Sequence, residues 1–391
     1  MTAGDKTLPH YFYYDPEILS LETKTIFDKP DAQLFWGHKA LVPEKGDYWV
    51  IPHSGSPRIL VNDGNNLNVV DNICRHRYAV MLEGKGNIKK IICPVHYWSY
   101  ELDGSLIKAP GFDPLPAWDL DCDGRCGDAQ RSLGRKDIVD YDSFILSKDF
   151  TLLSEALDVI KKYTSLKFNE LDFVDLEICP NKVNWKDYVD TYLDNYHIDV
   201  YHPGLKGLVN CNKIDFHWDE QFHVQAVQIK NTMIDAANGK YQPLLKMYKE
   251  KIGEFEETYG AIWAMVYPNI MIEIYEKFFF LNVVLPDDAE NCTVWKYSFC
   301  HKSLSQHPEI VRMYTEFLDE IEQQDIELMM KVNDGRKALY ARGDHYRGPY
   351  HPQKEQGQAH FHRWLLNRLG IDLDEQEEKH QVVALRRVEK S

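Results

Sequence analysis

The chain reads C-R-H from Cys74 to His76 and, after sixteen further residues, C-P-V-H from Cys93 to His96. Two pairs, each with one cysteine and one histidine, suit a [2Fe–2S] cluster in which the thiolates bind one iron and the imidazoles bind the other. Tetrahedral zinc is the competing interpretation, because two cysteines and two histidines also form a zinc ligand set. Zinc modules, however, usually pair cysteine with cysteine and histidine with histidine. The motif therefore favours the iron–sulfur cluster.

The residues around the second pair resemble a known family. The segment C-P-V-H-Y-W from Cys93 to Trp98 is similar to the cluster motif of the Rieske oxygenases, and a turn ending at Gly104 follows it. The resemblance covers residues 10–370 and identifies the chain as an α subunit, the terminal oxygenase component, of a Rieske non-heme iron oxygenase. It implies an oxidoreductase that uses O₂, a Rieske [2Fe–2S] cluster and a mononuclear Fe(II). The implied cluster ligands are Cys74, His76, Cys93 and His96.

Length and composition limit the class of protein. The chain has 391 residues, 44% hydrophobic and 27% charged, which suits a globular protein with two or three domains. The formal net charge of −16 argues against a nucleic-acid partner. We find no uncharged apolar stretch of about 18 residues, so no membrane span is expected. The N-terminus lacks a secretory pattern, and the cysteines outside the motif, including Cys122 and Cys126, are interpreted as reduced thiols of a cytoplasmic protein.

The first part of the sequence predicts a helix followed by a small β domain. Asp15 and Pro16 begin a helical pattern that continues to Phe27. An Asp-Gly hairpin turn at 63–64 lies between two of the strand-like runs that follow, at 39–42, 48–51, 58–61 and 67–70. We therefore expect a helical segment over 1–37 and an antiparallel β Rieske domain over 38–150 that presents the cluster motif on loops.

The rest of the sequence predicts an α+β catalytic domain over 151–391, with helices packed on an antiparallel sheet. Strand-like runs cover 173–179, 224–229, 261–266, 270–275, 278–285 and 293–299. Helical patterns cover 154–162, 184–196, 308–333 and 358–369. This domain is expected to hold the mononuclear iron.

Two histidines near the helix predicted over 184–196 are candidate iron ligands. On that helix Asp190, Asp194 and His197 follow i, i+4, i+7 spacing, which predicts one shared face, and His202 lies shortly beyond. The helix is rich in aromatic and apolar residues, so we expect it to be buried and its polar groups to need partners. The alternative is that the two histidines are ordinary surface residues, which is usual for an isolated pair.

The third ligand is expected to be Asp325. It fills a gap in the apolar stripe of the helix predicted over 308–333, where an unpaired carboxylate would be costly. With His197 and His202 it would complete a two-histidine, one-carboxylate site that leaves iron positions open. The alternative is that Asp325 lies at the margin of the stripe and pairs with a base. Weaker candidates, which lie off the stripe, are Asp319, Glu322 and Glu327.

The family resemblance agrees with these ligands. Its Asp/Glu-x-x-His-x-x-x-x-His segment is matched by Asp194, His197 and His202, and its downstream aspartate by Asp325 after two glutamines. At 190–191 this chain has Asp-Thr where many members have Glu-Asn. The resemblance also implies a head-to-tail homotrimer supplied with electrons by a ferredoxin or flavin reductase.

Within such a trimer, the resemblance gives Asp194 a role in catalysis. Its carboxylate would join the ligand His197 to a cluster histidine of the neighbouring subunit, His96 in preference to His76. The opposite interpretation is an ordinary surface carboxylate.

The substrate is the least constrained prediction. The aromatic residues Trp263, Tyr267, Phe278 and Phe280 are candidates for the cavity wall and favour a small aromatic or hydrophobic substrate, as in aromatic hydrocarbon catabolism. Mono- or dioxygenation, oxidative N- or O-demethylation and oxidation of a quaternary ammonium compound all use this machinery. A pure Rieske electron carrier is disfavoured, because it would leave Asp325 and most of the chain without a role.

Overall fold

A computed structural model describes residues 6–29, 32–112, 132–149, 151–229, 241–253, 258–344 and 346–373. The chain begins with the helices α1 (Tyr11–Tyr14) and α2 (Pro16–Glu22), and α2 continues into a π-helical turn (Thr23–Phe27). The Asp15 carboxylate caps α2 by accepting a hydrogen bond from the backbone N–H of Glu17 at 2.8 Å. The helix predicted from Pro16 to Phe27 is confirmed. The pair Cys122 and Cys126 lies outside the described residues.

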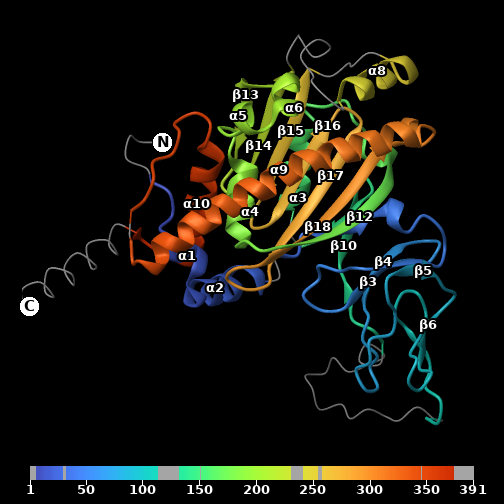
Figure 1. The fold of residues 1–391 in the computed structure, drawn as a ribbon. Coiled ribbons are helices and arrows are strands. Elements are labelled where there is room, and N and C mark those ends of the chain that lie inside the picture. The colour runs from blue at the N-terminus through green and yellow to red at the C-terminus, as the bar shows by residue number, and fades with distance from the viewer. Residues whose placement is uncertain are drawn as a thin grey trace, which may run out of the picture.

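Three small antiparallel sheets follow, in the strand orders β5-β2-β3-β4-β9, β6-β7-β8 and β1-β11-β10 (Figure 1). Their strands are β1 (Phe35–His38), β2 (Asp47–Val50), β3 (Arg58–Asn62), β4 (Leu67–Asp71), β5 (Lys85–Asn87), β6 (Ile91–Ile92), β7 (Ser99–Tyr100), β8 (Leu106–Lys108), β9 (Arg135–Lys136), β10 (Ile138–Tyr141) and β11 (Phe144–Ser147). The prediction of a strand at 39–42 is wrong. Lys39–Leu41 is a 3₁₀ turn, because the His38 imidazole accepts a hydrogen bond from the Ala40 N–H at 3.2 Å and turns the chain.

The second part of the chain is built on one seven-stranded antiparallel sheet in the order β12-β18-β17-β16-β15-β14-β13. Its strands are β12 (Leu171–Asn181), β13 (Val209–Trp218), β14 (Phe222–Ile229), β15 (Tyr259–Val266), β16 (Ile270–Tyr275), β17 (Phe278–Pro286) and β18 (Cys292–His301). The predicted α+β fold with helices on an antiparallel sheet is confirmed. The strand β13 was not predicted.

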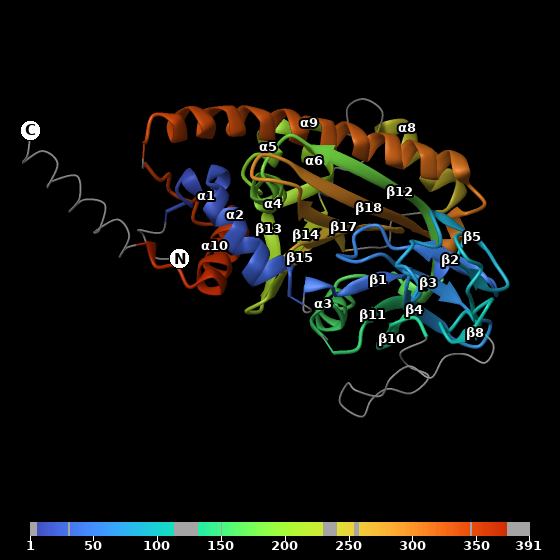
Figure 2. The same cartoon turned by 90° about the horizontal axis from the view of Figure 1, so that it is seen from below.

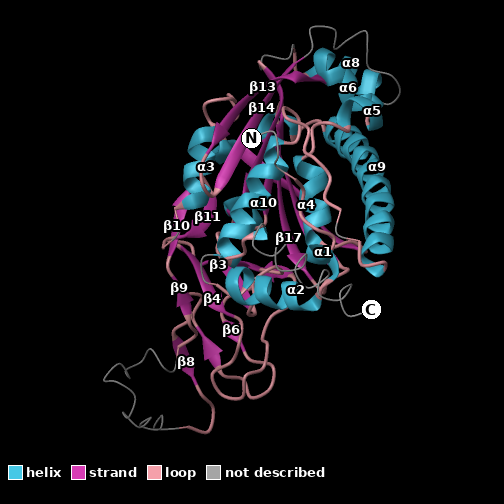
Figure 3. Ribbon diagram, turned by 90° about the vertical axis from the view of Figure 1, so that its left-hand side faces the viewer, coloured by secondary structure: helices cyan, strands magenta, loops and turns pink. Residues whose placement is uncertain are grey.

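The centre of the large sheet is buried on both faces, as the alternation along β15 shows. Ile262 and Ala264 belong to the core shared with the helix α3 (Leu152–Ile160), while Trp263 and Met265 face the opposite side. The helices on that side are α4 (Trp185–Leu193), α9 (Pro308–Ala341) and α10 (Gln356–Leu369), and α9 runs obliquely across the sheet (Figures 1 and 3). The helices α1 and α2 pack beside α4 and α10 (Figure 2).

Among the predicted helices, α9 and α4 differ most from their expected ends. α9 continues to Ala341, beyond the expected limit at 333. α4 ends at Leu193, because Asp194 takes an extended conformation with φ −88° and ψ 107°. Asp190, Asp194 and His197 therefore do not share one helical face, and that prediction is wrong. Three further helices were not predicted, α5 (Ile198–Tyr201), α6 (Pro203–Leu208) and α8 (Tyr241–Lys251). Among the described residues, a helix long and apolar enough to cross a membrane is absent.

Candidate metal centres and substrate cavity

The two loops of the cysteine–histidine motif have the same backbone geometry. In each, the cysteine N–H donates to the carbonyl oxygen five residues later, at 2.9 Å for Cys74 and 2.8 Å for Cys93. Four residues after each cysteine, Tyr78 and Tyr97 take positive φ angles of 63° and 60°. Such angles are uncommon for residues with a side chain and mark a sharp reversal of the chain. The two loops are thus matched turns that present their cysteines and histidines side by side.

The side chains of these loops fit a cluster with two different irons. Burial raises the pKa of the Cys74 thiol, and the adjacent Cys93 raises it further, while the Tyr100 hydroxyl acts in the opposite direction. The rings of His76 and His96 lie 4.6 Å apart. The Nδ1 atom of His76 is buried and makes no hydrogen bond within the described part of the chain. An adjacent thiol pair and an adjacent imidazole pair with an unsatisfied nitrogen match a Rieske ligand set.

The structure brings His197, His202 and Asp325 together from three different elements. His197 precedes α5, His202 lies between α5 and α6, and Asp325 belongs to α9. The Nε2 atoms of His197 and His202 are 3.0 Å apart, and Asp325 Oδ1 lies 3.2 Å and 2.9 Å from them. Metal–nitrogen bonds of about 2.1 Å would place neighbouring ligands of a metal about 3 Å apart. The three atoms therefore fit one face of a metal coordination shell, and we refer to these residues as the triad.

The charges at the triad favour a cation at its centre. Burial lowers the pKa of His197, but the carboxylates of Asp194 and Asp325 outweigh burial and raise it to about 9. Burial raises the pKa of Asp325, and hydrogen bonds from His197 and His202 outweigh it, so the net pKa is lowered. Both shifts show that the site attracts positive charge.

Each histidine of the triad has a partner on its other ring nitrogen. Asp194 Oδ2 lies 3.1 Å from Nδ1 of His197, an ion-pair distance without hydrogen-bond geometry, and Gln324 Oε1 lies 2.8 Å from Nδ1 of His202 in a hydrogen bond. Such partners fix the orientation of a metal-binding imidazole and its tautomer. Asp194 was singled out from the sequence. Gln324 was noted there only as part of a motif, and its contact with His202 is visible only in the structure.

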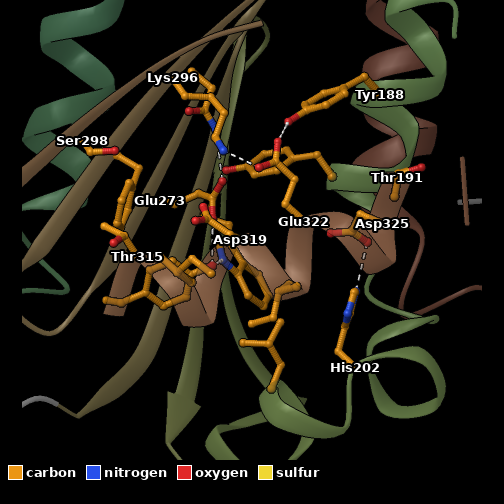
Figure 4. A pocket seen from close by; sticks show the side chains of 18 of the residues that line it. Tyr188, Thr191, His202, Glu273, Lys296, Ser298, Thr315, Asp319, Glu322 and Asp325 are labelled. Atoms are coloured by element: carbon orange, nitrogen blue, oxygen red, sulfur yellow. Dashed lines mark hydrogen bonds and ion pairs between the residues drawn. The ribbon is translucent and has the colours of Figure 1, made fainter. Parts of the chain in front are cut away.

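A cavity of about 360 Å³ lies between the large sheet and the helices α4 and α9, and the triad forms part of its wall (Figure 4). The cavity lining carries more negative than positive side chains. Lys296 is the one lysine among the described lining residues, and these include no arginine. The carboxylates outside the triad and Asp194 are Asp175, Glu177, Glu273, Asp319 and Glu322. Such a cavity favours cationic over uncharged ligands.

The predicted aromatic lining is half correct. Trp263 and Phe280 line the cavity. Phe278 instead stacks on Tyr314 with ring centroids 4.0 Å apart, and the Tyr267 hydroxyl lies 2.7 Å from Nδ1 of His360, in a different buried region. Of the three weaker ligand candidates, Asp319 and Glu322 line the cavity without joining the triad, and Glu327 is exposed.

Glu273 is one of several cavity residues that were not predicted from the sequence. A pattern in β16 could have revealed it, because in a strand every second residue faces the same side. Met271 and Tyr275 are buried on the side of α4 and α9, so Glu273 places a carboxylate on an otherwise buried sheet face.

Two centres of this kind, one a Cys₂His₂ loop pair and the other a His₂Asp triad beside a cavity, define a two-centre iron oxygenase. Models of two families match: the Rieske [2Fe–2S] domain over residues 34–119 and the ring-hydroxylating α subunit (catalytic domain) over residues 160–371. The chain belongs to the Rieske oxygenase α subunits, and its cofactors are a Rieske [2Fe–2S] cluster and a mononuclear non-heme iron.

Curated relatives of the chain are named for an amine, putrescine, and for the quaternary ammonium compounds glycine betaine and choline. A putrescine 2-hydroxylase of Ralstonia nicotianae is 29% identical over 376 residues, covering 93% of this chain and 96% of the relative. The oxygenase subunit of a glycine betaine monooxygenase of Chromohalobacter salexigens is 31% identical over 211 residues, 52% of this chain and 44% of the relative. Among solved structures, a quaternary ammonium Rieske monooxygenase matches with a TM-score of 0.72 at 20% identity, covering 93% of this chain and 95% of the other. Naphthalene 1,2-dioxygenase from Rhodococcus sp. has the same fold, with a TM-score of 0.70 at 19% identity, covering 93% and 94%.

Proposed function

We propose that this chain is an oxygenase that hydroxylates a small aliphatic amine in its cationic form. The observation that carries the proposal is the excess of carboxylates in the cavity beside the triad. Lys296 pairs with Glu177 and Glu322, but an aromatic hydrocarbon would leave the other carboxylates of the cavity desolvated beside a ligand that cannot compensate their charge, which is costly. An ammonium ion would compensate them. The relatives named for putrescine, glycine betaine and choline support a cationic substrate. From the sequence we expected an aromatic substrate, with a quaternary ammonium compound as an alternative, and a small aliphatic amine was not among the predictions.

In this proposal the triad residues His197, His202 and Asp325 bind Fe(II), oriented by Asp194 and Gln324. The cluster is bound by Cys74, His76, Cys93 and His96. When bound, the cluster supplies single electrons and the iron supplies a site for O₂ activation. The electrons come from a ferredoxin or a flavin reductase. We place the boundaries of the Rieske domain at 38–150 and of the catalytic domain at 151–391.

We also propose that electrons pass between subunits of a head-to-tail homotrimer. In the folded subunit, the strands that carry the cluster loops lie at the opposite end from α5 and α6, which flank the triad histidines (Figures 1 and 3). Exposed apolar side chains surround both ends, Tyr78 and Tyr97 beside the cluster and Tyr196 and Val200 beside His197. Packing one end of a subunit against the other end of its neighbour would bury these side chains, and a closed ring satisfies every copy.

A single turnover tests the proposed reaction. The purified protein, with both metals loaded and the cluster reduced, is mixed with O₂ and a panel of diamines, monoamines, quaternary ammonium ions and small aromatic compounds. Mass spectrometry should detect an amine that has gained one oxygen atom with its carbon skeleton intact. A formaldehyde assay on the same samples identifies demethylation instead. Hydroxylation of the aromatic compounds alone would reject the amine proposal.

A further inference from the structure

Glu273 has an unusual position in the large sheet. Its neighbours across the strands are Trp263 on β15 and Phe280 on β17, and all three residues line the cavity (Figure 4). On its own strand, Met271 is 0% exposed and Tyr275 is 5% exposed. The carboxylate thus lies in an apolar and aromatic surface, with α9 above it.

Neutral donors hold the Glu273 carboxylate in a fixed orientation. Trp263 Nε1 donates to the Tyr275 hydroxyl at 2.9 Å, and that hydroxyl donates to Glu273 Oε2 at 2.8 Å. Asn282 Nδ2 donates to the other oxygen, Oε1, at 3.2 Å. A carboxylate accepts about four hydrogen bonds. Two acceptor positions are therefore used by these donors, and the others are available to a ligand.

Glu273 differs from the other cavity glutamates because it has no ionic partner among the described residues. Lys296 forms ion pairs with Glu322 and with Glu177, the latter at 3.0 Å. Burial, more than any other effect, raises the pKa of Glu273, which reaches about 7 with help from the negative charges of Glu322 and Asp325 and against the Tyr275 hydrogen bond and Lys296. A buried carboxylate without a cation is costly, and a ligand cation removes that cost.

We infer that Glu273 binds the ammonium group of the substrate through N–H···O hydrogen bonds, so that the cavity selects primary and secondary ammonium ions over quaternary ones. A quaternary ammonium ion has no N–H group, so it cannot use the free acceptor positions of the carboxylate. The inference rests on the proposed function and adds the residue and the chemical group that decide the choice of amine.

Equilibrium binding to the holoenzyme tests this inference without turnover. Calorimetry under anaerobic conditions compares 1,4-diaminobutane with butyltrimethylammonium, for the wild type, Glu273→Gln and Glu316→Gln. Glu316 lies on α9, is exposed and pairs with Arg312, so its variant is a matched control outside the cavity. The wild type and the control should bind 1,4-diaminobutane at least tenfold more tightly than the quaternary ion. Glu273→Gln should weaken diamine binding by about 10- to 100-fold, because a hydrogen bond to a charged group is lost, and should leave binding of the quaternary ion within about threefold.

Iron content and cluster absorption must match those of the wild type in every variant. If Glu273→Gln does not fold, Tyr275→Phe replaces it, since it removes the hydroxyl that orients the carboxylate and should reduce the preference for the diamine severalfold. An unchanged preference in a folded variant, or a wild type that prefers the quaternary ion, overturns the inference. Tight diamine binding without an oxygenated product in the single turnover would instead reject the proposed function and leave the role of Glu273 standing.

Discussion

Asp325 Oδ1 lies 2.9 Å from Nε2 of His202, although 123 positions separate the two residues in the sequence. α9 carries the aspartate across the large sheet to the short helices α5 and α6, where the two histidines lie. The contact closes a three-atom site from two distant parts of the chain. Its geometry leads to the first two predictions.

Asp325→Ala should abolish binding of the mononuclear iron and leave the cluster intact, because the substitution removes one of the three proposed iron ligands and the cluster loops lie elsewhere. Iron analysis and the visible absorption of the cluster measure the two metals separately. Asp334→Ala, an exposed aspartate on the same helix, is the control and should keep both metals. A full iron content in Asp325→Ala would reject Asp325 as a ligand.

Asp194→Asn should retain both metals and lower turnover by about 10- to 100-fold, the usual effect of removing the outer partner of a metal-binding imidazole. Asp194 Oδ2 lies 3.1 Å from His197 Nδ1, and a neutral amide at this position carries no charge to stabilise the imidazole. Stopped-flow reoxidation of the reduced cluster measures electron transfer directly. Asp199→Asn, which removes an ion pair with Lys354, should reoxidise at the wild-type rate. Wild-type reoxidation in Asp194→Asn would contradict a relay through this residue.

Arg336→Met should lower the free energy of unfolding by about 3–5 kcal/mol, because breaking a buried ion pair leaves uncompensated charges. Arg336 on α9 pairs with Asp187 and, at 3.2 Å, with Asp190, two buried aspartates of α4. Urea unfolding measures the change. Lys337→Met, the next residue, removes only a half-exposed pair with Glu290 and should cost less than about 1 kcal/mol. Equal losses in the two variants would show that the Arg336 pairs contribute no more than a surface pair.

His53 should make the protein less stable in acid. Burial lowers the pKa of its imidazole to about 4, whereas an unfolded histidine titrates near 6.5. Between these values the unfolded chain binds the additional proton, so the free energy of unfolding falls as the pH falls from about 6.5 to 4, by up to about 3 kcal/mol.

The variant His53→Phe isolates this contribution, since the new ring can keep the stacking on Phe35, where the centroids are 5.9 Å apart. Urea midpoints measured from pH 7 to pH 4.5 should fall less steeply in this variant than in the wild type. His38, whose pKa burial also lowers to about 4, remains in both proteins and accounts for part of the slope that is left. Parallel pH profiles of wild type and variant would contradict the assignment to His53.

Short-range sequence patterns predicted most elements of the fold. The cap formed by Asp15 and Pro16 and the alternation of apolar residues along β15 and β16 depend on near neighbours in the chain, so they can be read from the sequence. The helix predicted to continue past Leu193 was wrong, because a tertiary environment holds Asp194 in an extended conformation beside His197. The prediction that Phe278 and Tyr267 line the cavity was wrong as well. Aromatic residues on strands occur both in cores and in cavity walls, and the amino-acid composition does not separate the two.

The sequence was sufficient to predict the chemistry of both centres, since thiols, imidazoles and a carboxylate on an apolar stripe restrict the possible metals before any contact is known. How these groups meet, and the charge of the cavity that supports the proposed substrate, became visible only in the folded chain. The pairing of Lys296 with Glu177 and Glu322 leaves Glu273 without an ion-pair partner in the described part of the chain. This pairing depends on the register of β12, β16, β17 and β18 and on the placement of α9. Electrostatic balance in a cavity is a sum over residues that are far apart in the chain, so no local pattern reveals it.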